Sequence, residues 1–160
     1  MKKILASVLI CIFIQTPFVL AFELKDFDNT PHILDEKIGN GRWTLLMFWA
    51  HDCGICKAEF PSLSTFNKQR DDVDVIGVSI DGENKKHLAQ SFLDSTKPSF
   101  TSYITSLSLV AFNYRALTEE DFRGTPTFLL FSPDGELIGN NPGKLSITAL
   151  ENFIEKNSNN

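Results

Sequence analysis

Residues 45–57 of this chain read LLMFWAHDCGICK. The apolar run over residues 45–49 predicts a short buried strand, and the polar pair His51-Asp52 ends it. Cys53 and Cys56 then open a segment that can continue as a helix. Free backbone N–H groups and the helix dipole at such an N-terminus stabilise an anion, so they favour the thiolate form of the first cysteine. A Cys-x-x-Cys pair in this place indicates a dithiol that cycles to a disulfide.

Two other interpretations of the cysteine pair are weaker on chemical grounds. A structural zinc ion needs four ligands, whereas the chain has three cysteines in all, and its three histidines, His32, His51 and His87, are scattered. A purely structural disulfide across so short a loop would constrain the unfolded chain little. We therefore expect redox chemistry, with no resident metal and no cofactor.

The N-terminal 21 residues have the pattern of a secretory signal peptide. Lys2 and Lys3 form a small basic region, an apolar run follows to residue 20, and Ala21 supplies the small residue before the expected cleavage site. We divide the chain into a signal peptide, residues 1–21, and one domain, residues 22–160. The periplasm is the expected location, with an uncleaved membrane anchor as the alternative. Cys11 would leave with the signal, so the exported chain would keep only the Cys-x-x-Cys pair.

The charge of the expected mature chain argues against some partners. Loss of Lys2 and Lys3 lowers the number of basic residues from 15 to 13, against 20 acidic ones, for a net charge of −7 with histidine neutral. Nucleic acids and anionic membrane surfaces are therefore not expected as partners. The remaining length, about 139 residues, suffices for one domain with its own core.

Hydrophobic patterns and turn residues predict a mixed α/β fold. The expected order is a β-hairpin, then strand, helix, strand, helix, a short strand, a helical insert, a second hairpin and a closing helix. Strands joined through helices should be parallel, and the late hairpin at Pro133-Asp134-Gly135 should be antiparallel. The predicted strands are 22–27, 32–34, 43–49, 72–80, 100–104, 127–131 and 136–139, and the predicted helices are 58–70, 83–95, 106–117 and 146–156.

Three short motifs together resemble the thioredoxin superfamily. They are Phe48-Trp49-Ala50 before the cysteine pair, Gly124-Thr125-Pro126-Thr127 before a strand, and the Asp134-Gly135 hairpin. The resemblance covers nearly all of residues 22–160. It implies a thioredoxin-like fold: a mixed central sheet flanked by helices, with an N-terminal β-hairpin and a helical insert before the cis-proline strand.

Further motifs narrow the resemblance. Glu59-Phe60-Pro61 follows the cysteine pair, and about 46 residues separate Ile80 from Pro126, more than plain thioredoxin requires. In these respects the chain is similar to the exported TlpA/ResA-like (DsbE-like) thiol–disulfide oxidoreductases. The cysteine pair and the Thr-Pro pair are fairly specific for the fold. The motifs that indicate the subfamily are less specific.

The resemblance also implies roles by position. Cys53 would be the exposed nucleophile and Cys56 the buried resolving thiol. Pro126 would be a cis-proline facing the sulfurs, and Thr125 would offer backbone hydrogen bonds to a substrate strand; an ordinary trans proline at a strand start is the alternative. Trp49 would pack under the active-site turn, and we group it with Thr125 and Pro126 as the substrate-binding residues.

The chain departs from the thioredoxin pattern near the dithiol. Met47 stands where thioredoxin keeps a buried acid, Asp52 precedes the first cysteine where many relatives have an aromatic residue, and Ile55 replaces the commonest proline. An acid as close to the sulfur as Asp52 would disfavour a thiolate. These changes leave the redox potential of the pair open.

Two residues are candidates to tune the dithiol. Glu83 is the expected substitute acid, because ResA-like proteins carry a functional glutamate after the corresponding strand. In a partly buried pocket its carboxylate could take a proton from the resolving thiol; a solvated acid at a helix start is the other interpretation. His51 is either a titrating neighbour of Cys53 or an exposed loop residue.

The resemblance implies a protein-disulfide reductase that acts on disulfide-containing exported proteins, with apocytochrome c among the candidates. A membrane electron donor similar to DsbD would have to recharge it, because the expected compartment has no reducing glutathione pool. We expect a monomer. Two alternatives stay open: a dithiol oxidase that donates its disulfide, and a non-catalytic peptide-binding module of the same fold. A peroxidase of related fold is disfavoured, because the Thr-x-x-Cys environment of its reactive cysteine does not surround Cys53.

Overall fold

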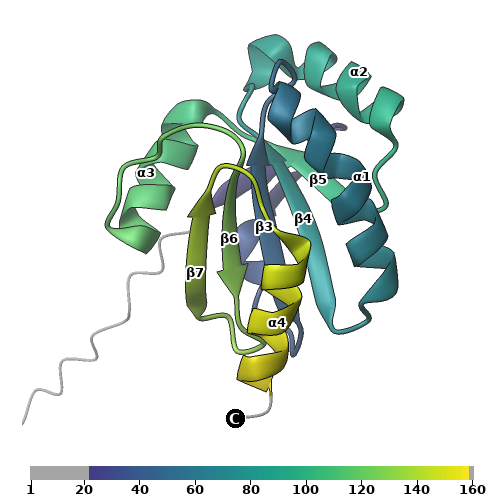
Figure 1. Ribbon diagram of the computed structural model, residues 1–160. Coiled ribbons are helices and arrows are strands. Elements are labelled where there is room, and N and C mark those ends of the chain that lie inside the picture. The colour runs from purple at the N-terminus through teal and green to yellow at the C-terminus, as the bar shows by residue number, and fades with distance from the viewer. Residues whose placement is uncertain (1–21, 159–160) are drawn as a thin grey trace, which may run out of the picture.

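The computed structural model describes residues 22–158 as one mixed sheet with helices on both faces (Figure 1). The predicted signal peptide, residues 1–21, lies outside the described residues, as do residues 159–160. Seven strands are ordered β2-β1-β5-β4-β3-β6-β7 across the sheet. They are β1 (Glu23–Lys25), β2 (Pro31–Ile33), β3 (Trp43–Trp49), β4 (Val73–Ser79), β5 (Thr101–Ile104), β6 (Thr127–Phe131) and β7 (Leu137–Pro142).

β3 is the central strand because both of its faces are covered. All seven of its residues are buried, as expected for an apolar strand between two helical layers. β4 pairs with it in parallel, with Phe48 opposite Val78, and β6 pairs with it antiparallel, with Phe48 opposite Thr127. The predicted combination of parallel pairs and a late antiparallel hairpin is confirmed. The carboxyl end of β3 leads directly into the Cys-x-x-Cys turn.

The helices divide between the two faces of the sheet (Figure 1). The helices α1 (Gly54–Gln69), α2 (Lys86–Thr96) and α4 (Ile147–Ser158) share one apolar core, and α3 (Leu107–Thr118) packs into a second core on the other face. Successive residues of β3 alternate between these cores, as a strand must. Trp49 lies in the first and Phe48 in the second. α3 is the predicted helical insert, since it stands between β5 and the cis-proline strand β6.

The N-terminal hairpin is confirmed, although its strands are short. β1 pairs antiparallel with β2 and reaches β5 through Lys25 and Ile104, and a 3-10 turn, η1 (Leu34–Glu36), follows. The predicted helix 83–95 is wrong at its start: a separate 3-10 turn, η2 (Glu83–Lys85), precedes α2. No helix among residues 22–158 combines the length and the apolar character that a membrane span requires.

Candidate active site

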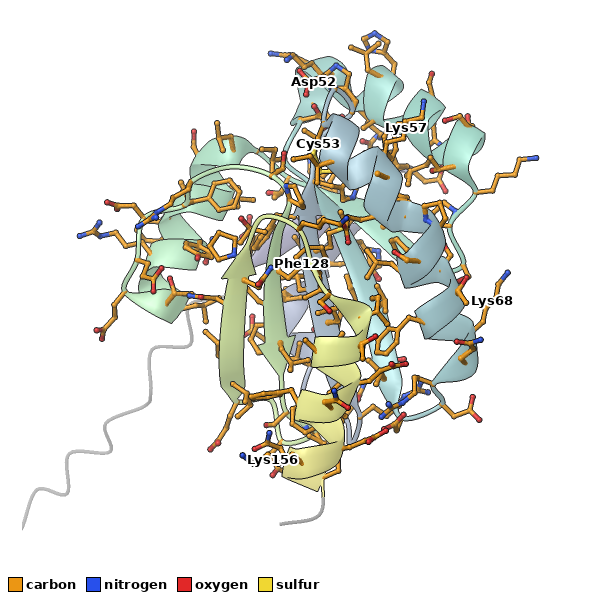
Figure 2. The ribbon with its side chains drawn as sticks, viewed as in Figure 1. Asp52, Cys53, Lys57, Lys68, Phe128 and Lys156 are labelled. Carbon is orange, nitrogen blue, oxygen red and sulfur yellow. A yellow bond between two sulfur atoms is a disulfide. The ribbon has the colours of Figure 1, made fainter. Side chains whose placement is uncertain are left out.

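The two cysteines lie at the N-terminus of α1, directly after the central strand (Figure 2). Cys53 is the N-cap residue, and its Sγ accepts a hydrogen bond from the Cys56 backbone N–H at 3.1 Å. A disulfide of 2.05 Å joins the two sulfurs. Cys53 is partly exposed, whereas Cys56 is completely buried. The N–H groups of the first helical turn would stabilise a thiolate at Cys53, because they have no partner within the helix.

The Thr125–Pro126 peptide bond is cis. It immediately precedes β6, whose Thr127 lies opposite Phe48 of β3. Pro126 is therefore at the same edge of the sheet as the turn that carries the cysteines. The Thr127 hydroxyl donates to the Gly124 carbonyl at 2.6 Å, which closes this loop. Thr125 is partly exposed and Pro126 is buried, so Thr125 offers the accessible surface of the pair.

Trp49 packs under the active-site turn, as predicted, but its burial does not agree with our grouping of it with the substrate-binding residues. Its side chain is completely buried. The indole stacks on Phe92 with ring centroids 4.9 Å apart and meets Phe60 edge-on at 5.4 Å. The reason is the strand alternation: this position of β3 faces the layer formed by α1 and α2. Trp49 supports the active-site turn from inside the core.

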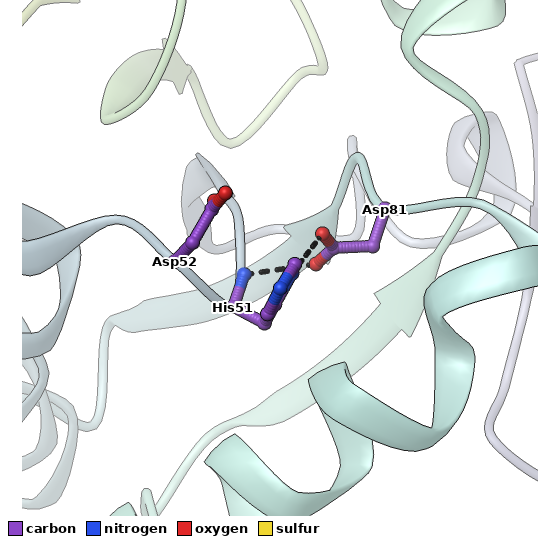
Figure 3. Close-up of side chains that lie close together, drawn as sticks. All are labelled: His51, Asp52 and Asp81. Carbon is purple, nitrogen blue, oxygen red and sulfur yellow. Dashed lines mark hydrogen bonds and ion pairs between the residues drawn. The ribbon is translucent and has the colours of Figure 1, made fainter.

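A buried carboxylate anchors the turn between β3 and α1 (Figure 3). Asp81 accepts hydrogen bonds from the His51 backbone N–H at 2.9 Å, from His51 Nδ1 at 2.5 Å and from the Ser79 hydroxyl at 2.7 Å. The Asp81 side chain is 3% exposed and the His51 side chain 16%. His51 is therefore no exposed loop residue, because its ring is fixed two positions before Cys53.

The sequence interpretation missed Asp81, which it treated only as the end of a strand. A signal was present. β4 neighbours β3 in parallel, and side chains that follow the carboxyl ends of neighbouring parallel strands meet at one edge of the sheet. A polar residue directly after β4 should therefore lie beside the cysteine turn.

Glu83 does not occupy a partly buried pocket beside the dithiol. Its side chain is 58% exposed, and its carboxylate lies 3.9 Å from Lys25 Nζ. It lines a cavity of about 550 Å³ between the N-terminal hairpin and the start of α3, and neither cysteine lines that cavity. The predicted partly buried position is wrong, and the exposed position agrees with the other interpretation, a solvated acid; the chain turns at Gly82, whose φ is +67°. Asp81, directly before Gly82, stays beside the cysteine turn.

A second buried acid lies on α1, one turn after Cys56. Glu59 is 3% exposed, and its carboxylate has no hydrogen-bond or ion-pair partner among residues 22–158. Residues three positions apart lie on the same side of a helix, so Glu59 and Cys56 share a face. A carboxylate one helical turn from the resolving thiol is a candidate to exchange a proton with it. The sequence analysis named Glu59 only as part of the Glu59-Phe60-Pro61 motif and gave it no role of its own.

His51, Asp52 and Asp81 also offer possible metal ligands within 4.8 Å of one another. Imidazole and carboxylate groups can bind divalent cations. Here, however, His51 Nδ1 and Asp81 Oδ1 already form a hydrogen bond with each other. The third residue, Asp52, is exposed. The arrangement is that of a hydrogen-bonded pair with a solvated neighbour.

Sequence comparison agrees with this geometry. The AhpC/TSA family profile matches residues 17–139. The methylamine utilization protein MauD of Paracoccus denitrificans is 34% identical over 85 residues, which are 53% of this chain. The matched segment spans only 40% of the length of MauD.

Solved structures share the fold at lower identity. A secreted disulfide oxidoreductase of Mycobacterium tuberculosis, homologous to E. coli DsbE, has a TM-score of 0.66 and 23% identity over 86% of this chain and 96% of that one. A putative thiol:disulfide interchange protein DsbE of Chlorobium tepidum has a TM-score of 0.69 and 23% identity over 85% of this chain and 92% of that one. This chain therefore belongs to the AhpC/TSA family and has the thioredoxin-like fold of thiol–disulfide oxidoreductases, with a Cys-x-x-Cys pair at disulfide distance.

Proposed function

We propose that this protein is an exported thiol–disulfide oxidoreductase that reduces disulfides in other exported proteins. The observation that carries the proposal is the asymmetry of the cysteine pair: Cys53 is accessible at the N-cap of α1, and Cys56 is completely buried. An accessible sulfur can exchange with a substrate, whereas a buried one can react only within the chain. Ile55, exposed between the two cysteines, and Thr125 at the same sheet edge would contact the substrate.

The reaction would proceed through a mixed disulfide. The reduced Cys53 thiolate attacks one sulfur of the substrate disulfide, so a new S–S bond forms while the substrate's S–S bond breaks. The departing substrate sulfur takes up a proton. Cys56 then loses its proton and attacks the Cys53 sulfur, which forms the internal disulfide and releases the second substrate thiol. Two electrons pass to the substrate, and a membrane dithiol donor of the DsbD kind would return two electrons and two protons.

Glu59 takes the place of Glu83 in this proposal as the acceptor of the Cys56 proton. It is buried on the same helix face as the resolving thiol and has no other partner among the described residues. Glu59→Gln should slow release of the second substrate thiol and leave formation of the mixed disulfide unchanged. Rapid acid quenching with mass spectrometry separates the two steps, and equal slowing of both would contradict this role.

The sequence and the comparisons support the cellular setting of the proposal. Residues 1–21 have the pattern of a signal peptide, and the similar protein of Mycobacterium tuberculosis is described as secreted. Exported proteins with exposed disulfides, apocytochrome c among them, are the substrate class that such a reductase would meet. The protein would act as a monomer in the periplasm.

The reduction potential of the Cys53–Cys56 pair tests the direction of electron flow. Equilibration with defined thiol buffers should give a value near or below about −230 mV, as for reducing members of the fold. A value near about −120 mV would make the protein an oxidant that donates its disulfide. Replacing both cysteines with serine tests the binding-module alternative. A redox enzyme should lose all turnover in this variant. If the unchanged protein shows no turnover and the variant binds a substrate peptide as tightly as it does, the proposal is overturned.

A further inference from the structure

We propose that His51, oriented by Asp81, accepts the proton that Cys53 loses when it becomes the attacking thiolate, and returns it to the departing substrate sulfur. The inference deepens the proposed function and rests on Cys53 being the nucleophile. It concerns a side chain that lies outside the cysteine pair and the cis-proline loop.

The hydrogen bonds of His51 determine which ring nitrogen is free. An ionised carboxylate only accepts hydrogen bonds, so His51 Nδ1 must carry the hydrogen that it shares with Asp81 at 2.5 Å. The other ring nitrogen, Nε2, has no partner among residues 22–158. In the neutral ring that nitrogen is a proton acceptor, and in the charged ring it is a donor. A carboxylate that fixes the tautomer of a histidine in this way leaves the second ring nitrogen able to take up a proton.

The chain itself keeps the ring near the nucleophile. The Cys53 backbone N–H donates to the Ala50 carbonyl at 3.1 Å, which folds residues 50–53 into a tight turn with His51 and Asp52 at its centre. Two residues of chain span at most about 7 Å between the Cα atoms of His51 and Cys53. Asp81 accepts a hydrogen bond from the His51 backbone N–H, which holds the turn in place, and the ring cannot swing away from Asp81 without breaking its own Nδ1 hydrogen bond.

Asp81 is suited to hold a charged ring. Its carboxylate is buried and is held just after the neighbouring strand β4, so it can compensate the charge of an imidazolium at His51. The acid that thioredoxin keeps on the central strand is absent here: Met47 fills that position and is completely buried. The His51–Asp81 pair thus supplies a proton-accepting group at the nucleophile's side of the dithiol. Glu59 remains on the side of the resolving cysteine.

Other charged groups around the turn are solvated. Asp52 lies beside His51 in the turn, Lys57 follows on the exposed side of α1, and Glu83 and Lys85 lie on η2 after Asp81. All four are exposed, and Glu83 pairs with Lys25. Solvent and salt screen such charges strongly, so the buried carboxylate of Asp81 dominates the field at the ring.

The proton transfers balance. Cys53–SH and neutral His51 give Cys53–S⁻ and the imidazolium, which Asp81 stabilises. The thiolate attacks the substrate disulfide, one S–S bond forms as another breaks, and the imidazolium gives its proton to the departing substrate thiolate. His51 is neutral again, and no group outside the substrate and this chain is needed.

The test is the pH dependence of Cys53 alkylation by iodoacetamide in the reduced full-length chain with Cys56→Ser. Mass spectrometry of the Cys53 peptide reports on that thiol alone. At pH 6 the Cys56→Ser protein with His51 unchanged should react about tenfold faster than the same protein carrying His51→Asn. A shift of one pH unit in the midpoint of the Cys53 titration would produce a tenfold difference. Asp81→Asn should likewise react more slowly at pH 6 than the protein in which His51 and Asp81 are unchanged. Above pH 10 all proteins should react equally, because every thiol is then ionised.

Controls separate the possible outcomes. His87→Asn changes an exposed histidine on α2 and should leave the profile unchanged. Asparagine at position 51 can still donate to Asp81, so full reactivity in His51→Asn, with loss only in His51→Ala, would show that His51 merely positions the turn and would overturn the inference. The inference would also be overturned if the pH profiles of His51→Asn and Asp81→Asn coincided with that of the protein in which His51 and Asp81 are unchanged. A His51 protein that itself lacks thiolate reactivity below pH 8 would refute Cys53 as the activated nucleophile, and with it the proposed function.

Discussion

Removing the Asp81 carboxylate should destabilise the folded protein, and the structure allows the cost to be worked out. Asp81→Ala takes the acceptor from the His51 backbone N–H, from the His51 ring and from the Ser79 hydroxyl. Ser79 is completely buried, so its hydroxyl would lose a partner that water cannot replace, at a cost of about 1–3 kcal/mol. The ring and the N–H of His51 are nearer to solvent, and each should cost about 0.5–1 kcal/mol. The expected loss in free energy of unfolding is about 3 kcal/mol.

Urea unfolding of the oxidised protein at pH 7 measures this loss. With a slope of about 2 kcal/mol per molar urea, the midpoint should fall by about 1.5 M. Asp81→Asn keeps an acceptor oxygen and should lose only about 1 kcal/mol. Asp71→Ala removes an exposed aspartate and should change stability by less than about 0.5 kcal/mol. A loss below about 1 kcal/mol in Asp81→Ala, with the slope unchanged, would refute the view that this carboxylate holds the active-site turn.

Three further predictions concern the thiols, the core and one surface ion pair. Cys56→Ser should accumulate a mixed disulfide with a model disulfide substrate, visible on non-reducing gels, and Cys53→Ser should not; trapping by both variants alike would count against the assigned order. Phe60→Ala should cost about 3–5 kcal/mol in urea unfolding, because the ring contacts three other aromatic rings and is buried, and a loss under 1.5 kcal/mol would contradict that packing. The bidentate Arg70 guanidinium lowers the pKa of Asp72, so its stabilisation is present above about pH 4 and disappears as the pH falls through the lowered pKa. Because the Asp72 side chain is about half exposed, Asp72→Asn should cost at most about 0.5–1 kcal/mol at pH 7 and progressively less as the pH falls below about 4. An equal loss at pH 7 and at about pH 3 would argue against the ion pair.

Local sequence signals account for much of the fold. The apolar run at 45–49 predicts a short buried strand, and the predicted strand 43–49 has the bounds of β3, which is buried on both faces. The Pro133-Asp134-Gly135 turn marks the second hairpin through local backbone chemistry, and the apolar segment predicted as a helix at 106–117 corresponds to α3. The position of the cysteines at a helix N-terminus also follows from adjacent residues. Each of these features depends on residues within a few positions of one another, which is why the sequence shows them.

The surroundings of the dithiol depend on which strands become neighbours, and no local pattern contains that information. Glu83 was a reasonable candidate by its distance along the chain from β4, yet the turn at Gly82 directs it to the hairpin side, where it pairs with Lys25. Trp49 packs under the active-site turn as expected, but the alternation of β3 directs its side chain into the core and away from a substrate surface. The sequence alone shows a Cys-x-x-Cys dithiol at the end of a central strand in an α/β domain. Only the packing of β4 against β3 brings Asp81, 30 residues away, onto His51, because a hydrogen bond between distant residues exists only once the sheet has formed.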